Sequence, residues 1–138
     1  MIDRKRLGVQ LNLDEGRKEK PYTDTVGKIT IGVGHNLTDK GLPQQIIDML
    51  LEIDIDDAER DLVNNLPWYG MLDPIRQEVL VNMCFNMGWP VLAQFKNTLD
   101  LIKTGQYDKA ADAMLASKWA KQVGARANRL ASKMRNGK

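Results

Sequence analysis

Hydrophobic positions near the start of the chain change their period once. Leu7 and Leu11 lie four residues apart, as on one face of a helix, and Gly16 is a natural stop for a helix over residues 2–15. The next stretch, PYTDTVGKITIGVGH, instead contains a turn signal followed by alternating β-branched residues. We therefore predict a helix and, after it, a β-hairpin over residues 20–35.

Alternation in the second strand of this hairpin predicts two unlike faces. His35 and the branched apolar residues fall on one face, whereas Thr30 falls on the other with Gly32 and Gly34. The second face is nearly bare of side chains, and glycine lets a bulky ligand come close to the backbone. A bulge or bend in the strand is the other explanation for glycines at this spacing.

The rest of the chain has helical patterns. Pro43 suits the first turn of one helix, and Asp54, followed by further acids, suits the N-cap of another. Asp73 and Pro74 begin a segment that ends at Gly88, and its run VLVNMCFNM is apolar nearly all round, as in a helix at the centre of a bundle. These elements predict an α+β fold, mostly helical, with a small β-hairpin lobe after the first helix. Further helices are predicted over residues 98–103, 108–116 and 126–135.

Charge is unevenly distributed along the 138 residues, although the net charge is only +2. Residues 1–69 contain 9 basic and 13 acidic residues, whereas from Lys118 onward there are seven basic residues and no acid. Such a basic segment is either a solvated helix face or a surface that attracts a polyanion such as nucleic acid, anionic lipid or cell-wall polymer. The length suits a single domain, and we expect neither a membrane span nor a secretory signal.

The chain contains one cysteine, Cys84, and one histidine, His35. Cys84 lies in an apolar run and is expected to be a buried, inert thiol, because no second cysteine can form a disulfide with it. A single histidine and a single cysteine do not suffice for a structural zinc site. We expect neither a metal nor a cofactor.

Two acids lie on either side of the change from helix to hairpin. Glu15 is predicted in the last turn of the helix beside Asp14, where the helix dipole and the neighbouring acid favour a protonated carboxyl, as a general acid requires. Asp24 is predicted in the hairpin, which folds back toward the end of the helix. Glycoside hydrolysis requires one protonated and one ionised carboxyl across a cleft. An exposed surface glutamate and an Asx-type turn residue are the alternatives.

Thr30 is the one hydroxyl on the glycine-lined face of the hairpin. We predict that this hydroxyl holds a water molecule near Asp24. A simple preference of threonine for strands is the alternative explanation.

The ordered pattern from Glu15 to His35, EG-x5-Y-x-D-T-x-G-x2-T-I-G-x-G-H, closely resembles the phage lysozymes of the T-even type, which are endolysins of one glycoside hydrolase family. The later segments RQEVLVNMCFNMG, FKNTLDLIKTGQYDKAADAM and ARANRLASKMRNG resemble the same family. The resemblance implies a single lysozyme domain over residues 1–138, with an active-site cleft between two lobes. The smaller, β-containing lobe would span about residues 14–53, and the helical lobe would comprise residues 1–13 plus 54–138.

The resemblance also implies an enzyme, a lysozyme (muramidase) that hydrolyses the β-1,4 bond between N-acetylmuramic acid and N-acetylglucosamine in bacterial peptidoglycan and lyses the host cell. Position by position, Glu15 would be the general acid, Asp24 the second carboxylate and Thr30 the residue that positions the water. The family's reaction inverts the anomeric centre, which demands roughly 6.5–9.5 Å between the two carboxyls. A catalytically silent peptidoglycan-binding module is the alternative from another functional class.

Other positions match the family less specifically. Phe85, Thr98 and Gly32 would contact the substrate, although Phe85 could equally pack in the core and Thr98 could equally cap a helix. The resemblance suggests that His35 forms a structural salt bridge with Asp54.

The basic C-terminal region supports a third hypothesis. Four basic residues lie broadly along one side of the last predicted helix, with Leu130 and Met134 on another, as in helices that bind an anionic polymer or membrane: Arg126, Arg129, Lys133 and Arg135. Aromatic residues are not interleaved with these charges, so we expect no nucleic-acid partner. We further expect a monomer that stays in the host cytoplasm until a separate pore protein releases it to the cell wall.

Overall fold

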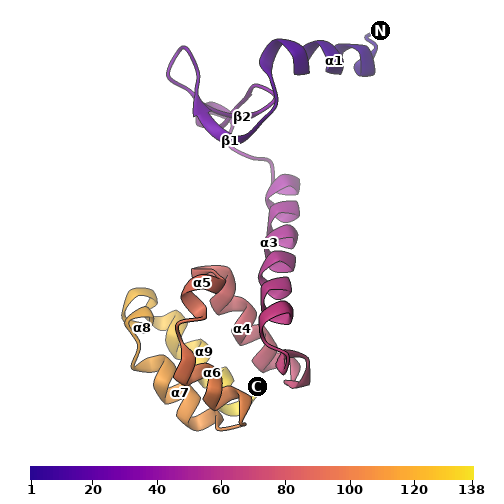
Figure 1. Cartoon of the computed structure of the whole chain (residues 1–138). Helices are drawn as coiled ribbons and strands as arrows, with labels where there is room; N and C mark the ends of the chain where they lie inside the picture. Colours follow the sequence, from indigo (N-terminus) through magenta and orange to yellow (C-terminus); the bar gives the residue numbers. More distant parts are fainter. The chain divides into compact units, whose positions relative to one another are not determined.

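Nine α-helices and one small antiparallel sheet follow one another along the chain in a computed structural model that describes residues 1–138. The predicted α+β fold class is confirmed. The chain divides into two compact units, residues 1–49 and residues 50–138. Figure 1 shows the whole chain, coloured by residue number. In chain order the elements are α1 (Arg4–Glu15), β1 (Lys18–Thr23), β2 (Ile29–Gly32), β3 (His35–Asn36), α2 (Leu37–Lys40), α3 (Gln44–Asn65), the 3-10 helix η1 (Tyr69–Met71), α4 (Pro74–Met87), α5 (Trp89–Leu92), α6 (Lys96–Lys103), α7 (Tyr107–Leu115), α8 (Lys118–Val123) and α9 (Ala125–Asn136).

Helix α1 in the first unit has a well-defined beginning and end. The side chain of Asp3 accepts a hydrogen bond from the backbone N–H of Arg6 at 2.9 Å, which caps the first turn. Gly16, with a φ of 76°, turns the chain away after Glu15 and donates its N–H to the carbonyl of Asn12 at 3.0 Å. The predicted helix and its predicted stop are thus confirmed.

The three strands of the first unit form a meander in the order β1-β2-β3. Thr30 pairs with Tyr22 on one side and with Asn36 on the other, so it occupies the central strand. The prediction that this strand continues to His35 is wrong. β2 ends at Gly32, where φ is 67°, and the chain turns so that His35 pairs back with a residue of β2 in the neighbouring strand β3.

Helix α3 is a single helix from Gln44 to Asn65, so Asp54 lies inside it and does not begin a separate helix as predicted. The physical reason is that no glycine or proline interrupts residues 44–65, and an isolated acid stops a helix only where the chain also leaves helical geometry. Its buried residues, Ala58 and Leu62, belong to the second unit.

The second unit is built around α4. Asp73 caps this helix by accepting from the N–H of Arg76 at 3.1 Å, Pro74 is its first residue, and Gly88 ends it, all as predicted. Val79, Leu80, Met83 and Cys84 are buried on it. Burial raises the pKa of the Cys84 thiol, and the negative charge of Asp61 adds to this effect, so the prediction of an unreactive thiol agrees with its surroundings.

The later helices form one bundle with α4 (Figure 1). α9 runs beside both α7 and α4, and α6 packs on α7. The predicted helices over residues 98–103, 108–116 and 126–135 correspond to α6, α7 and α9. Three helices of only four to six residues, α2, α5 and α8, were not predicted, because so few residues show no periodicity. No helix is both long enough and apolar enough to cross a bilayer.

Candidate functional site

Glu15 is the last residue of α1, and its carboxyl group lies against the turn between β2 and β3. A Cβ atom added to Gly34 in that turn would be 2.8 Å from Oε2 of Glu15 and 2.9 Å from its Cδ. The absence of a side chain at Gly34, which has a φ of 65°, therefore leaves the space that the carboxyl group occupies. The Glu15 side chain is otherwise exposed to solvent, so a ligand can reach it.

Asp24 organises the turn between β1 and β2. One carboxylate oxygen, Oδ1, accepts hydrogen bonds from the N–H groups of Val26 at 2.9 Å and Lys28 at 2.8 Å. This is the Asx-turn arrangement, and the structure therefore confirms the alternative that the residue serves the turn. The second oxygen, Oδ2, makes no hydrogen bond within the protein. Asp24 thus combines a fixed backbone position with one oxygen that remains available to a ligand.

Thr30 is buried in the middle of the sheet, with 4% of its surface exposed. Its hydroxyl donates to the carbonyl oxygen of Lys28 at 3.1 Å. Because that bond uses the only hydroxyl proton, Thr30 can act toward a water molecule only as an acceptor. Asp24 is opposite Lys28 across the hairpin, and Thr30 is opposite Tyr22, so Asp24 and Thr30 share one face of the sheet.

A groove of about 410 Å³ lies between the residues that follow α1 and the β2–β3 turn. Gly32 and Val33 line it on one side, and Arg17, Lys18 and Glu19 line it on the other. Gly32 has open space where a Cβ would lie, which is the room for close approach that the sequence predicted for this position. The groove is thus lined by residues that adjoin Glu15 and Gly34 in sequence, although neither of these two residues lines it.

His35 has a partner within its own unit. Its Nε2 lies 2.6 Å from the carbonyl oxygen of Gly41, and since a carbonyl only accepts, this nitrogen carries the proton. Asp54 lies on the part of α3 that belongs to the second unit. The salt bridge expected between His35 and Asp54 stays a prediction, as does the grouping of residues 1–13 with the helical lobe.

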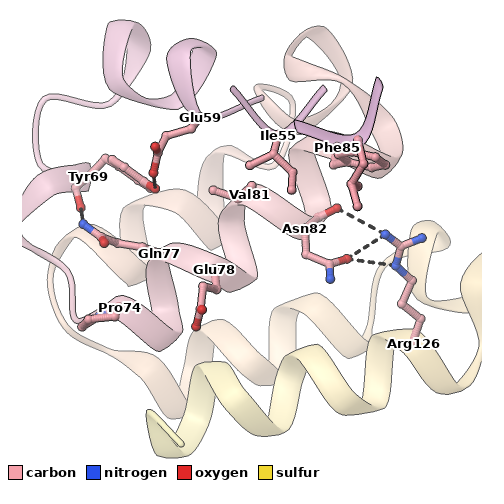
Figure 2. A pocket seen from close by; sticks show the side chains of 11 residues that line it. Ile55, Glu59, Tyr69, Pro74, Gln77, Glu78, Val81, Asn82, Phe85 and Arg126 are labelled. Carbon is pink, nitrogen blue, oxygen red and sulfur yellow. Dashed lines mark hydrogen bonds between the residues drawn. The ribbon is translucent and has the colours of Figure 1, made fainter. Parts of the chain in front are cut away.

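A cavity of about 610 Å³ in the second unit is lined by residues of α3, α4 and the segment between them, together with Arg126 of α9. Phe85 lies at its wall with 43% of its surface exposed, so Phe85 is not part of the core. Figure 2 shows the guanidinium of Arg126 held beside it by Asn82. Arg126 donates to Oδ1 of Asn82 from Nε at 3.0 Å and from Nη2 at 2.7 Å.

A second hydrogen-bonded pair, Tyr69 and Glu59, also lines this cavity. The hydroxyl of Tyr69 donates to Oε2 of Glu59 at 2.6 Å (Figure 2 shows both side chains). Burial raises the pKa of Tyr69, and the hydrogen bond to Glu59 and the negative charges of Glu59 and Glu78 raise it further. The cavity is thus an apolar hollow with a fixed cation on one side and a fixed anion on the other.

Thr98 lies inside α6 and has only 5% of its surface exposed. The helix begins two residues earlier, at Lys96, with Phe95 in the N-cap position. The interpretation of Thr98 as a helix cap is therefore wrong, because the helix starts without a side-chain cap and leaves Thr98 on its buried face. Its contact with a substrate stays a prediction.

Two relationships at these sites were missed in the sequence. The Asn82–Arg126 pair joins residues 44 positions apart, and the Glu15–Gly34 contact joins a helix end to a turn. Neither follows from periodicity, because each depends on packing between elements. A glycine in the predicted strand was the one local signal that a neighbouring group needed space at Gly34.

A mostly helical α+β fold with a small three-stranded antiparallel sheet after the first helix is consistent with a lysozyme-like protein. Residues 13–136 match the family model described as Phage lysozyme, and the chain belongs to this family. The resemblance found in the sequence is thereby confirmed, and membership makes the chain a lysozyme with bacterial peptidoglycan as its class of substrate.

Relatives with related names cover nearly the whole chain. Two proteins of Dictyostelium discoideum, "Probable T4-type lysozyme 1" and "Probable T4-type lysozyme 2", are each 31% identical to it over 92% of this chain and 92% of their own length. The "Pre-baseplate central spike protein Gp5" of Enterobacteria phage T4 is 31% identical over 90% of this chain, which matches 26% of that larger protein.

Proposed function

We propose that the protein hydrolyses the β-1,4 bond between N-acetylmuramic acid and N-acetylglucosamine, with Glu15 as general acid and Asp24 as the second carboxylate. The observation that carries this proposal is the seating of the Glu15 carboxyl group in the space left by Gly34. A side chain that only kept the surface soluble would not need a glycine with positive φ beneath it. Asp24, which lies in the same unit and has a free Oδ2, supplies the second carboxylate that the reaction needs.

In the proposed reaction, Glu15 gives its proton to the leaving glycosidic oxygen while the bond from that oxygen to the anomeric carbon breaks. A water molecule adds its oxygen to the anomeric carbon from the opposite face. Oδ2 of Asp24 accepts the proton that the water loses, and the hydroxyl oxygen of Thr30 accepts a hydrogen bond from the same water. Direct attack by water inverts the anomeric centre, with roughly 6.5–9.5 Å between the carboxyls.

Replacement of Glu15 by Gln tests the assignment of the acid. Gln retains the shape above Gly34 and removes the proton, so we expect the loss of turbidity of purified peptidoglycan to slow by at least about 100-fold. Glu52→Gln, which changes an exposed glutamate of α3, is the charge-matched control and should keep the wild-type rate. A Glu15→Gln protein that clears peptidoglycan as fast as wild type would remove Glu15 from the mechanism.

Replacement of Asp24 by Asn separates the two duties of this residue. Asn can still accept the hydrogen bonds from Val26 and Lys28 through its carbonyl oxygen, so the turn should persist. We expect an unchanged melting temperature together with a loss of hydrolysis.

The stereochemistry of the wild-type reaction tests the direct attack by water. Analysis of the first wild-type product by NMR should show a new reducing end on muramic acid with the α configuration, and a β product would exclude direct attack by water.

The remaining expectations belong to the same proposal. A silent binding module would retain peptidoglycan without releasing reducing ends, so the wild-type assay decides between it and the enzyme. We propose that synthesis occurs in the host cytoplasm, with lysis following release by another protein.

Two observations weigh against the membrane hypothesis. Leu130 and Met134, the apolar residues that would enter a membrane, are only 5% and 0% exposed, and the side chain of Arg126 is held by Asn82.

A further inference from the structure

A second hollow in residues 50–138, of about 340 Å³, lies between two tryptophans. Trp68 precedes the 3-10 helix η1, and Trp89 is the first residue of α5. Leu66 and Leu99, each 7% exposed, also line it. None of the residues that line this hollow belongs to the candidate catalytic set.

The two indole rings present both an apolar surface and a polar group. Trp68 and Trp89 pack partly on the core and remain partly exposed. The indole N–H of the third tryptophan, Trp119, donates to Oδ1 of Asn86 at 2.8 Å, whereas those of Trp68 and Trp89 have no partner in the protein. No buried side-chain nitrogen or oxygen lacks a partner, so these two N–H groups reach solvent. Tryptophan in this state suits a ligand that is part apolar and part polar.

The rim of the hollow carries charges that the protein itself does not pair. Lys96, Asp100 and Lys103 are spaced four and three residues apart on α6, so they lie on one face of the helix. All three are exposed, and none forms an ion pair. The rim therefore combines a net positive charge with a carboxylate that can accept hydrogen bonds from hydroxyl groups.

We propose that this hollow is an additional glycan-binding site that holds an amino-sugar unit of the peptidoglycan strand. The C–H face of a pyranose ring carries partial positive charge and stacks on the negative face of an indole. Asp100 and the free indole N–H groups match the hydroxyl and acetamido groups of such a sugar. Lys96 and Lys103 match the negative charge that muramic acid brings, as a free carboxylate in the isolated sugar and as the carboxylates of the attached stem peptide in the polymer, and that N-acetylglucosamine lacks.

A site of this kind would keep the enzyme on its polymer between cleavage events. Binding at a second point raises the effective concentration of the strand at the first, provided that one strand spans both. The class of ligand rests on the proposed function, whereas the existence of the site rests on the tryptophan pair and its charged rim.

NMR of the indole N–H groups tests the site directly. The full chain carrying Glu15→Gln is labelled with ¹⁵N and titrated with N-acetylglucosamine tetramer and, separately, with the disaccharide of N-acetylglucosamine and N-acetylmuramic acid. We expect the signals of Trp68 and Trp89 to shift with one common Kd while that of Trp119 stays in place. Signals are assigned from Trp68→Phe and Trp89→Phe proteins. The muramic acid disaccharide should bind more tightly than the neutral N-acetylglucosamine dimer, which is titrated in parallel as the ligand of matched length.

Retention on insoluble peptidoglycan gives a second readout. In the Glu15→Gln background, Trp68→Ala should lower retention by about tenfold, and Lys103→Glu should lower it with no change in melting temperature. Lys109→Glu, an exposed lysine on α7 outside the hollow, is the matched control and should not lower retention.

The outcomes separate this inference from the proposed function. Indole signals that do not move, or that move equally with sodium acetate, overturn the glycan site even if the wild-type protein hydrolyses peptidoglycan. If Glu15→Gln retains hydrolysis, the catalytic assignment fails, while shifts of the Trp68 and Trp89 signals with the disaccharide still support the site.

Discussion

The carboxyl group of Glu15 lies over the backbone of Gly34 so closely that a Cβ atom at position 34 would be 2.8 Å from Oε2. The end of α1 and the β2–β3 turn are therefore fitted to each other through a missing side chain. Since Glu15 is the proposed general acid, the glycine is a positioning residue for it. The contact also explains why a glycine with φ of 65° occurs in the turn at this residue.

Gly34→Ala should lower activity more than it lowers stability. The added methyl group meets the flexible end of Glu15, which can move aside. The substitution should therefore lower the free energy of unfolding only by the left-handed backbone strain, about 1 kcal/mol. A displaced acid should slow hydrolysis by about 100-fold. Gly105→Ala, with a φ of 73° and open space around it, is the control for strain alone. Equal activity losses in the two variants would show that Gly34 does not position Glu15.

Arg76 should be one of the most sensitive positions in the second unit. Its guanidinium donates to the carbonyls of Met134 at 2.6 Å and Arg135 at 3.0 Å, and it stacks over the ring of Tyr107 at 3.6 Å. We expect Arg76→Ala to lower the free energy of unfolding by about 3 kcal/mol in urea denaturation. Arg129→Ala, an exposed arginine without a partner, should change it by less than about 0.5 kcal/mol.

Asp73 should make stability fall in acid. Partial burial of its carboxyl raises the pKa, but the hydrogen bonds from Arg76 and the charge of that residue outweigh burial, so the pKa is held below the ordinary value of 3.8. A group with a depressed folded pKa stabilises the protein above its unfolded pKa and loses that contribution as pH falls through the folded value. Asp73→Asn, which can still cap α4, should flatten the decline of melting temperature below pH 4. If the melting temperature of Asp73→Asn falls below pH 4 as steeply as that of the wild type, the carboxyl group of Asp73 is not the cause of the decline.

Tyr69 should make the stability of the protein fall in alkaline solution. Because burial and the Glu59 hydrogen bond raise its pKa above 10.0, its contribution is complete below the unfolded value and is lost as pH rises toward the folded one. Tyr69→Phe should lower the free energy of unfolding by about 1 kcal/mol at pH 7, and it should remove part of the loss of stability above pH 10. Thermal melts between pH 7 and 11 measure both effects. Tyr22→Phe, which changes a tyrosine with no hydrogen bond from its hydroxyl, is the control.

Several features of this protein follow from local physics that a sequence contains in full. The cap at Asp73, the proline after it and the glycine at position 88 define α4, because each acts within one turn of the helix. Glu15 at a helix end and Asp24 at a turn are equally local, since Gly16 stops the helix and the Asx bonds close the turn. The ordered motif that contains both acids identified the family.

Other features depend on contacts between segments that are distant in sequence. Asp54 looked like a helix start, but the continuous hydrogen bonding of α3 prevails where nothing breaks the helix. Thr98 was assigned to a helix cap as one alternative, and packing instead places it on the buried face of α6. Gly34 under Glu15, Arg126 beside Asn82 and the two indoles around one hollow exist only once the chain has folded.

The sequence alone therefore determined the main helices and the hairpin, the α+β class and the identity of the candidate acids, because capping, periodicity and turn chemistry act over a few residues. The tertiary structure decided which of these groups have room, which carboxylate oxygen is free and which tryptophans keep an open face. Those properties depend on what lies against each side chain, and a chain acquires such neighbours only by packing.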